Sequence, residues 1–241
     1  MSDISANSDG FVVTITIDRP AQRNAVDLAA CDAIASQVTT AVDDGAHVIV
    51  LTGAGGHFCA GAEISAAEDV RVAIRRVLDT LRAAPIVTIA AIDGAALGAG
   101  TQLAVACDLR VATATARLGV PAAKLGLAVD HKTVQQVAML AGSGQARAML
   151  LASEELSGQR AYDLGLVNRL GSLEDAQAWA AEIALLAPLT IAGHKLALNR
   201  LEADLADEDV NAAVLKAWSS EDLREGRAAF AEKRRPNFRG N

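Results

Sequence analysis

Hydrophobic residues recur along the first half of the chain with two different spacings. Residues 11–17 read FVVTITI, with threonine at alternate positions near the end of the segment, and this alternation predicts a strand. Residues 28–42 carry apolar side chains at helical spacing and follow Asp27, a residue type that caps helix N-termini. Residues 47–52 are apolar at nearly every position, so we expect a strand that is covered on both faces.

The order of strand, glycine loop and helix occurs twice. A loop rich in glycine, residues 53–56, follows the strand at 47–52. Later, residues 85–92 read as a buried strand, Asp93-Gly94 as a turn, and Gly98-Ala99-Gly100 as the lead into an apolar helix. Glycine is favoured in such loops because it adopts positive φ and lets another backbone approach closely. We interpret the two units as an internal repeat.

The second half of the chain changes from strands to helices. The same patterns predict short strands at 109–112, 118–120 and 166–170, and helices at 71–81, 101–107, 133–139, 144–151, 174–186, 191–205 and 209–232. Early strands and late helices predict an α/β core of about 190 residues, which we place at residues 1–188, followed by a helical extension at 189–241.

Composition and charge exclude several classes of protein. A net charge of -7 and an aromatic content of 3% offer little to attract or stack nucleic acid. Cys31, Cys59 and Cys107 are odd in number and far apart, which favours a reducing cytoplasm over a disulfide framework or a zinc site. The N-terminus lacks the basic and apolar regions of a secretory signal. The apolar segment 85–107 has glycines in its middle, so we expect no transmembrane segment there.

Neither glycine loop fits a nucleotide-binding motif. A larger residue, Phe58 or Leu103, stands where a dinucleotide fingerprint has its third glycine, and no Gly-Lys-Ser or Gly-Lys-Thr occurs. The four histidines show no metal-ligand spacing with cysteines or acids. We therefore expect neither a metal nor a separate cofactor.

Small residues at the start of two helices offer a different kind of site. Backbone amides there lack intrahelical partners, and the helix dipole adds positive potential. Small side chains, as in residues 59–62 and 98–100, let a ligand reach those amides. Two amides that face one point would hold a carbonyl oxygen and stabilise an enolate by roughly 3 kcal/mol per donor. Close packing of helices explains the same small residues, so these patterns leave both interpretations open.

Four stretches of the chain resemble the crotonase, or enoyl-CoA hydratase/isomerase, superfamily. They are Asp18-Arg19-Pro20 with Asn24-Ala25, IVLTGAGGHFCAGAEIS at 49–65, IDGAALGAGTQLAVACDLRVA at 92–112, and KRRPNF at 233–238. The resemblance spans nearly the whole chain. It implies an α/β, crotonase-like spiral of ββα units with a C-terminal helical region that forms a homotrimer or a dimer of trimers.

The resemblance also implies the ligand and the residues that bind it. The ligand class is acyl-CoA or enoyl-CoA thioesters of fatty-acid metabolism, with coenzyme A as part of the ligand. The oxyanion-hole donors correspond to Ala62 and Ala99, and the family usually has glycine at the second position. The residues expected to bind the substrate or coenzyme A are Arg23, Ala60, Gly61, Ala62, Glu63, Ile64 and Gly98.

Two departures from the family pattern bear on activity. The positions that resemble the two hydratase glutamates hold Gln102 and Ala122. Hydration of an enoyl thioester needs a base and an acid, each typically worth about 100-fold to 10,000-fold. An amide and a methyl group supply neither, so we expect negligible hydratase activity.

Asp130 is the one carboxylate that the resemblance leaves near the pocket. Some relatives with isomerase, dehalogenase or ring-closing activity place an acid there. The same residue also fits the N-cap of the helix that follows it. Three hypotheses stay open: an acyl-CoA binder without hydratase activity, an isomerase, hydratase-like enzyme or thioester hydrolase that uses Asp130, and a scaffold for oligomerisation.

Overall fold

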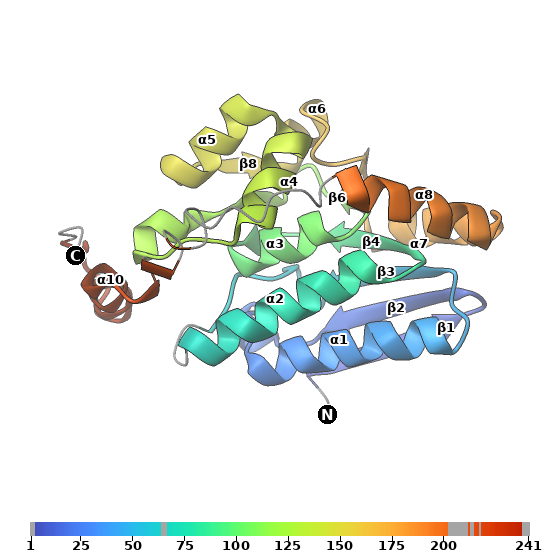
Figure 1. Ribbon diagram of the computed structural model, residues 1–241, viewed down its shortest axis with the longest axis horizontal. Helices are drawn as coiled ribbons and strands as arrows, with labels where there is room; N and C mark the ends of the chain where they lie inside the picture. Colours follow the sequence, from blue (N-terminus) through green and yellow to red (C-terminus); the bar gives the residue numbers. More distant parts are fainter. Residues whose placement is uncertain (1–2, 64–66, 202–211, 213–214, 217, 238–241) are drawn as a thin grey trace.

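The structure of the chain is a computed structural model that describes residues 3–63, 67–201, 212, 215–216 and 218–237. Its largest element is a six-stranded sheet in the order β1-β2-β3-β4-β6-β9 (Figure 1). These strands are β1 Ile4–Asp9, β2 Val12–Ile17, β3 Val48–Gly53, β4 Val87–Ile92, β6 Leu109–Ala112 and β9 Arg169–Leu170. β1 pairs with β2 in the antiparallel sense, and the other neighbours pair in parallel.

Helices cover both faces of this sheet. α1 (Leu28–Asp43), α2 (Ala67–Ala83) and α3 (Ala99–Ala106) share one apolar core with alternate strand residues, among them Ile49 and Leu51. α7 (Leu173–Ala184) packs on the other face, where Val48 and Val50 belong to a second apolar cluster. The prediction that β3 is covered on both faces is therefore confirmed.

A second sheet has three strands. It consists of β5 (Ala95–Leu97), β7 (Arg117–Gly119) and β8 (Glu155–Ser157) in the order β5-β7-β8. Leu118 and Leu156 of this sheet join the apolar core that α1, α2 and α3 cover. The two sheets thus share one core.

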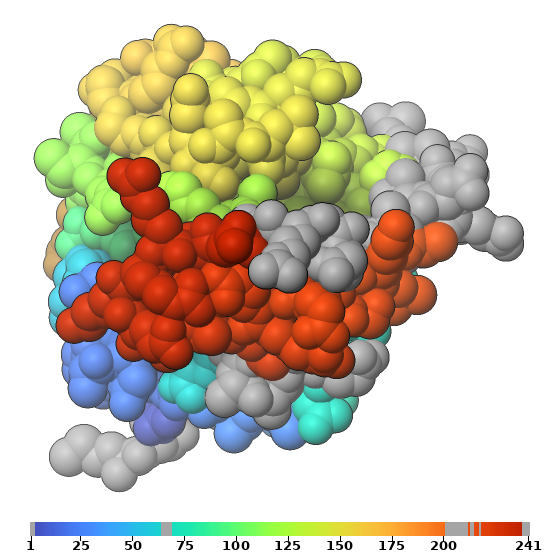
Figure 2. Space-filling view, turned by 90° about the vertical axis from the view of Figure 1, so that its left-hand side faces the viewer, coloured from blue at the N-terminus to red at the C-terminus, as the bar shows by residue number. Residues whose placement is uncertain are grey.

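The remaining elements surround these sheets. They are η1 Pro20–Gln22, η3 Pro121–Leu125, α4 His131–Ala141, α5 Ser143–Leu151, α6 Gly158–Asp163, α8 Pro188–Leu201 and α10 Glu221–Ala231. α8 and α10 lie at opposite ends of the molecule in Figure 1. Figure 2 shows α10, in red, between the layer of α4 and α5 and the layer of α1 and α2. No single described helix is long and apolar enough to cross a membrane, although α7 and α8, bent by 110°, meet that test as a pair.

Most elements predicted from the sequence are present, but three strands and the short helix α6 were missed, and one predicted helix was wrong. β1 was missed because only Ile4 among its residues is buried, so it shows no alternation. β5 and β8 have three residues each, too few for a periodic signal. The helix predicted at 209–232 is not continuous, because the Ser220 side chain accepts from Leu223 N–H at 3.1 Å and starts α10. The rest of that prediction falls largely outside the described residues, and the division at residue 188 stays a prediction.

Candidate functional site

The two glycine loops run side by side in parallel. Cys59 and Ala96 form an isolated parallel bridge. The Cys59 N–H donates to the Ala95 carbonyl at 2.8 Å, and the Cys59 carbonyl accepts from Leu97 N–H at 3.0 Å. Ala62 follows Cys59 by three residues, and Ala99 follows Ala96 by three. The pairing therefore carries both predicted oxyanion donors toward the same end of the two loops.

Glycines allow the loops to approach each other. A Cβ on Gly98 would lie 3.9 Å from the Gly61 Cα, so the two backbones are neighbours there. Gly61 has φ +132 and Gly98 has φ +54, a conformation that L side chains rarely adopt. The structure thus brings together the two small-residue segments that the sequence singled out.

The amides of Ala62 and Ala99 are among those that have no described acceptor in these loops, together with the amides of Gly61 and Gly100. On either side of Ala62, the Gly61 carbonyl accepts from Val26 N–H at 2.9 Å and Glu63 N–H donates to Val26. Within the described ranges, neither Ala62 N–H nor Ala99 N–H donates a hydrogen bond. Ala99 is the first residue of α3, where no intrahelical acceptor exists.

A buried arginine fixes the first loop. The Arg19 guanidinium contacts Asp27 at 2.6 Å and Glu63 at 3.1 Å, and Nη1 donates to the Ala25 carbonyl at 2.5 Å. The described partner of the Glu63 carboxylate is the Arg19 side chain, which ties the loop to the start of α1.

Asn24 holds the next part of the same loop. Its side chain is fully buried, accepts from Arg19 N–H at 2.8 Å and donates to the carbonyls of Ala54 and His57. The sequence marked Arg19 and Asn24 as family residues but gave them no role. The signal available in the sequence was a charged residue, Arg19, and an amide residue, Asn24, in the short segment around Pro20.

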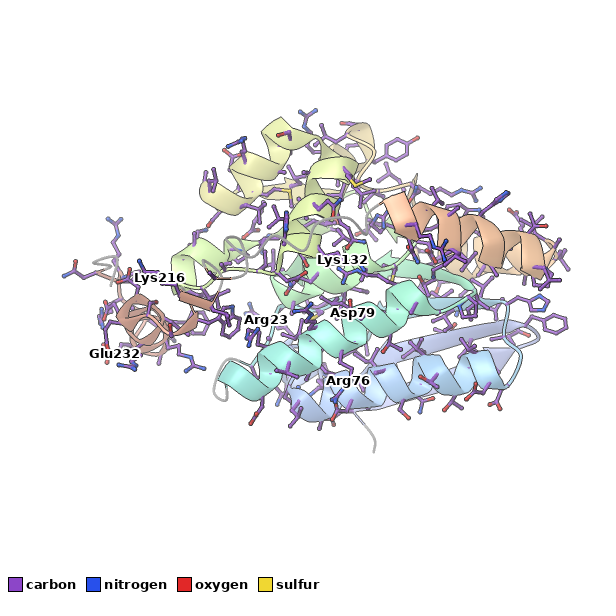
Figure 3. All side chains as sticks on the ribbon, viewed as in Figure 1. Arg23, Arg76, Asp79, Lys132, Lys216 and Glu232 are labelled. Atoms are coloured by element: carbon purple, nitrogen blue, oxygen red, sulfur yellow. The ribbon has the colours of Figure 1, made fainter. Side chains whose placement is uncertain are left out.

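Arg23 reaches the site through its backbone. Its carbonyl accepts from Ala60 N–H at 3.0 Å, and its φ of 52 turns the chain toward the loop. The side chain is exposed and lies, in the view of Figure 3, between α10 and α2. Ile64, the last residue of the predicted coenzyme A strip, lies outside the described residues.

Gln102, Thr133 and Asp130 form a hydrogen-bonded group beside the start of α4. Gln102 Nε2 donates to Asp130 Oδ2 at 3.1 Å and to Thr133 Oγ1 at 3.2 Å. Asp130 Oδ1 accepts from Thr133 N–H at 3.0 Å, and Oδ2 accepts from the Thr133 hydroxyl at 2.6 Å. The prediction that Asp130 caps this helix is confirmed. Ala122, at the other position expected for a glutamate, is buried in η3.

α10 packs over the segment that carries Ala122. A Cβ on Gly226 would lie 2.4 Å from the Leu125 carbonyl, so glycine is required at this crossing. Just before α10, Trp218 Nε1 donates to the Ala128 carbonyl at 2.7 Å, and the Arg71 guanidinium lies 5.9 Å from the Trp218 ring. These contacts place the start of α10 next to the loop that leads to Asp130.

A cavity of about 810 Å³ lies elsewhere, between the end of α2, α8 and Lys132. Its lining includes Asp79 and Lys132, which are labelled near the middle of the view in Figure 3. Its buried cations already have partners, since Arg82 donates to Gln136 at 2.7 Å and Lys195 contacts Asp108 at 2.7 Å. Lys195 also donates to the carbonyls of Leu81 in α2 and of Ile86 just before β4, so it holds α8 against the core.

The cysteine next to the first loop is a core residue. Burial raises the pKa of the Cys59 thiol to about 11, and burial raises the pKa of Cys31 and of Cys107 to about 12. A thiol with so high a pKa is not a nucleophile near neutral pH. The described residues contain no group of three histidine, cysteine or acidic side chains that would hold a metal.

We expect the three cysteines to resist alkylation in the folded protein. At pH 8, iodoacetamide should modify none of them in buffer and all three in urea. Folding raises each thiol pKa, so the folded protein holds these protons more tightly than the unfolded chain does. The contribution of the thiols to the free energy of unfolding is therefore complete below the unfolded pKa near 9, and it falls as the pH rises toward 11 to 12. Mass spectrometry of the labelled chain reads the result, and rapid labelling of native Cys59 would contradict this assignment.

Comparison with known proteins places the chain in a family. Residues 7–241 match the family described as enoyl-CoA hydratase/isomerase. A probable enoyl-CoA hydratase of Mycobacterium bovis is 43% identical over 236 residues, which cover 95% of this chain and 96% of that protein. The 2,3-dehydroadipyl-CoA hydratase of Escherichia coli is 33% identical over 256 residues, and the match covers 100% of both chains.

Solved structures agree on the fold. An enoyl-CoA hydratase from Mycobacterium avium subsp. paratuberculosis has a TM-score of 0.87 at 28% identity over 99% of both chains. Methylmalonyl-CoA decarboxylase has a TM-score of 0.91 at 22% identity over 100% of this chain and 99% of that one. The predicted α/β, crotonase-like fold is therefore confirmed. The chain belongs to the enoyl-CoA hydratase/isomerase family.

Proposed function

We propose that this chain binds acyl-CoA or enoyl-CoA thioesters in fatty-acid metabolism and does not hydrate them. In this proposal the thioester carbonyl accepts from the amides of Ala62 and Ala99, and Arg23 with residues 60–64 and Gly98 receives coenzyme A. Two amides without acceptors in neighbouring loops support the first part. The relatives named as hydratases of CoA thioesters support the ligand class.

The absence of proton-transfer groups at two positions carries the proposal on activity. Gln102 is an amide whose two N–H groups are engaged by Asp130 and Thr133, and Ala122 has no polar atom. An amide side chain does not exchange protons near neutral pH, so neither position activates water or protonates the α-carbon. Loss of both groups removes the acid and the base that hydration requires.

Titration with acyl-CoAs tests the binding part. The purified protein is titrated calorimetrically with saturated and trans-2-enoyl-CoAs of four to sixteen carbons. Binding of at least one series, with no decay of the enoyl absorbance, is the expected result. Failure of every thioester to bind would favour a scaffold over an acyl-CoA binder.

A second candidate function uses Asp130 as a base or nucleophile for isomerisation, a hydratase-like reaction or hydrolysis. Its supporting observation is that Asp130 is the carboxylate in direct contact with Gln102. Against it, both carboxylate oxygens already accept hydrogen bonds from Thr133. We favour the capping role.

Substitution of Asp130 separates the two roles. Asparagine caps helices about as well as aspartate, so Asp130→Asn should lose less stability than Asp130→Ala, which should lose about 1 kcal/mol or more. The affinity for saturated acyl-CoA should change little in Asp130→Asn. Thermal unfolding and calorimetry measure both effects. If the wild type turns over any thioester and Asp130→Asn does not, the enzymatic function replaces the binding one.

We also propose a homotrimer or a dimer of trimers in the cytoplasm. Leu185 and Leu189, next to and within α8, are 85% and 88% exposed, which supports contact with another copy. The three free cysteines support a reducing compartment.

A further inference from the structure

The contacts of Gln102 fix which way its amide faces. An ionised carboxylate accepts hydrogen bonds and donates none, so the atom that faces Asp130 Oδ2 at 3.1 Å is Nε2. The single hydroxyl hydrogen of Thr133 goes to the same carboxylate at 2.6 Å, so Thr133 Oγ1 is free to accept from Gln102 at 3.2 Å. The reverse amide orientation would set Oε1 against the carboxylate and lose both bonds.

This orientation leaves the Gln102 carbonyl oxygen as an acceptor without a donor. Among the described residues, none donates to Oε1. Gln102 is only 7% exposed, yet Oε1 is not among the fully enclosed polar atoms without a partner, so it borders open space. A polar atom held in this way in a nearly buried position favours a ligand that donates to it.

The place of Gln102 on α3 indicates which part of a ligand it meets. Gln102 follows Ala99 by three residues, so the two lie on the same side of the helix, one turn apart. Gln102 N–H donates to the Gly98 carbonyl at 3.0 Å, which closes that first turn. If Ala99 N–H holds the thioester carbonyl, the acyl atoms a few bonds from that carbonyl are the ones within reach of Gln102.

We propose that the site formed by Ala62, Ala99 and Gln102 selects acyl-CoA thioesters that carry a hydroxyl group on C3, through a hydrogen bond from that hydroxyl to Gln102 Oε1. The inference rests on the proposed acyl-CoA-binding function. It makes Gln102 a specificity-determining residue, with Asp130 and Thr133 as positioning residues. A keto group at the same carbon has no hydrogen to donate, so it gains nothing from Oε1.

The test compares ligands of one chain length on the intact protein. Calorimetry gives the affinities for saturated acyl-CoA, both epimers of 3-hydroxyacyl-CoA, and 3-oxoacyl-CoA. We expect one hydroxy epimer to bind about three- to tenfold tighter than the saturated ligand, in line with one net hydrogen bond, and the 3-oxo ligand to bind no tighter. Equal affinity of the saturated and hydroxy ligands would overturn the inference.

Two variants assign the effect to the amide oxygen. Gln102→Leu keeps the side-chain size and removes the acceptor, so saturated acyl-CoA should still bind while the hydroxyl preference disappears. Gln159→Leu, at an exposed position of α6, is the control and should bind all ligands as the wild type does. A hydroxyl preference that survives in Gln102→Leu would overturn the assignment. If no thioester binds the wild type, the proposed function itself fails, which is a different result from binding without preference.

Discussion

Replacing Ala99 with proline should lower the affinity for acyl-CoA by about a hundredfold while the fold is kept. Ala99 is the first residue of α3, after the cap residue Gly98. Proline is favoured at this helical position because its missing N–H has no intrahelical acceptor. The substitution therefore deletes the proposed oxyanion donor, and the proline ring occupies the space that the thioester oxygen needs.

Glycine at the same position is the matched control. Ala99→Gly keeps the amide hydrogen and removes one methyl group, so its acyl-CoA affinity should stay within about threefold of the wild type. Calorimetric titration of the three proteins, with thermal unfolding to check the fold, gives the comparison. Wild-type affinity in a folded Ala99→Pro protein would show that this amide does not hold the ligand.

Adding a methyl group at Gly100 should destabilise the protein by about 3 kcal/mol or more. A Cβ at this position would lie 2.0 Å from the Cys59 carbonyl oxygen, closer than atoms approach each other. That carbonyl belongs to the bridge that joins the two loops. We therefore expect Gly100→Ala to push the loops apart and to weaken acyl-CoA binding together with stability.

The corresponding residue of another helix is the control for this prediction. Gly144 is the second residue of α5, as Gly100 is of α3, and each helix has glycine as its cap residue. A Cβ on Gly144 would meet no atom within 4 Å. Gly144→Ala should therefore raise the free energy of unfolding by about 0.5–1 kcal/mol. Denaturant unfolding of both variants tests the pair, and equal effects would contradict the close contact at Cys59.

Local signals explain the elements that the sequence predicted. Asp27 accepts from Ala30 N–H at 2.7 Å and starts α1 where the apolar helical pattern begins. Strand β3 is apolar at nearly every position because α1, α2 and α7 cover its two faces. Both patterns depend on residues close in the chain, which a sequence displays directly.

Contacts between distant residues explain what the sequence missed. Glu63 lies 44 residues from its partner Arg19, and Gln102 lies 28 residues from Asp130. No local pattern predicts such pairs, so the sequence identified Gln102 as a changed residue but not as the one that holds Asp130. The parallel alignment of Cys59 with Ala96, which brings the two loops together, likewise depends on the tertiary fold.

Incubation of the wild-type protein with trans-2-enoyl-CoA, followed by native mass spectrometry, tests the central claim most directly. The claim is that the protein binds the thioester through the two loops and lacks the acid and base for hydration. The predicted result is a complex whose bound ligand has the mass of the unchanged enoyl-CoA. A ligand heavier by one water molecule would contradict it and would require a proton-transfer route that involves neither Gln102 nor Ala122.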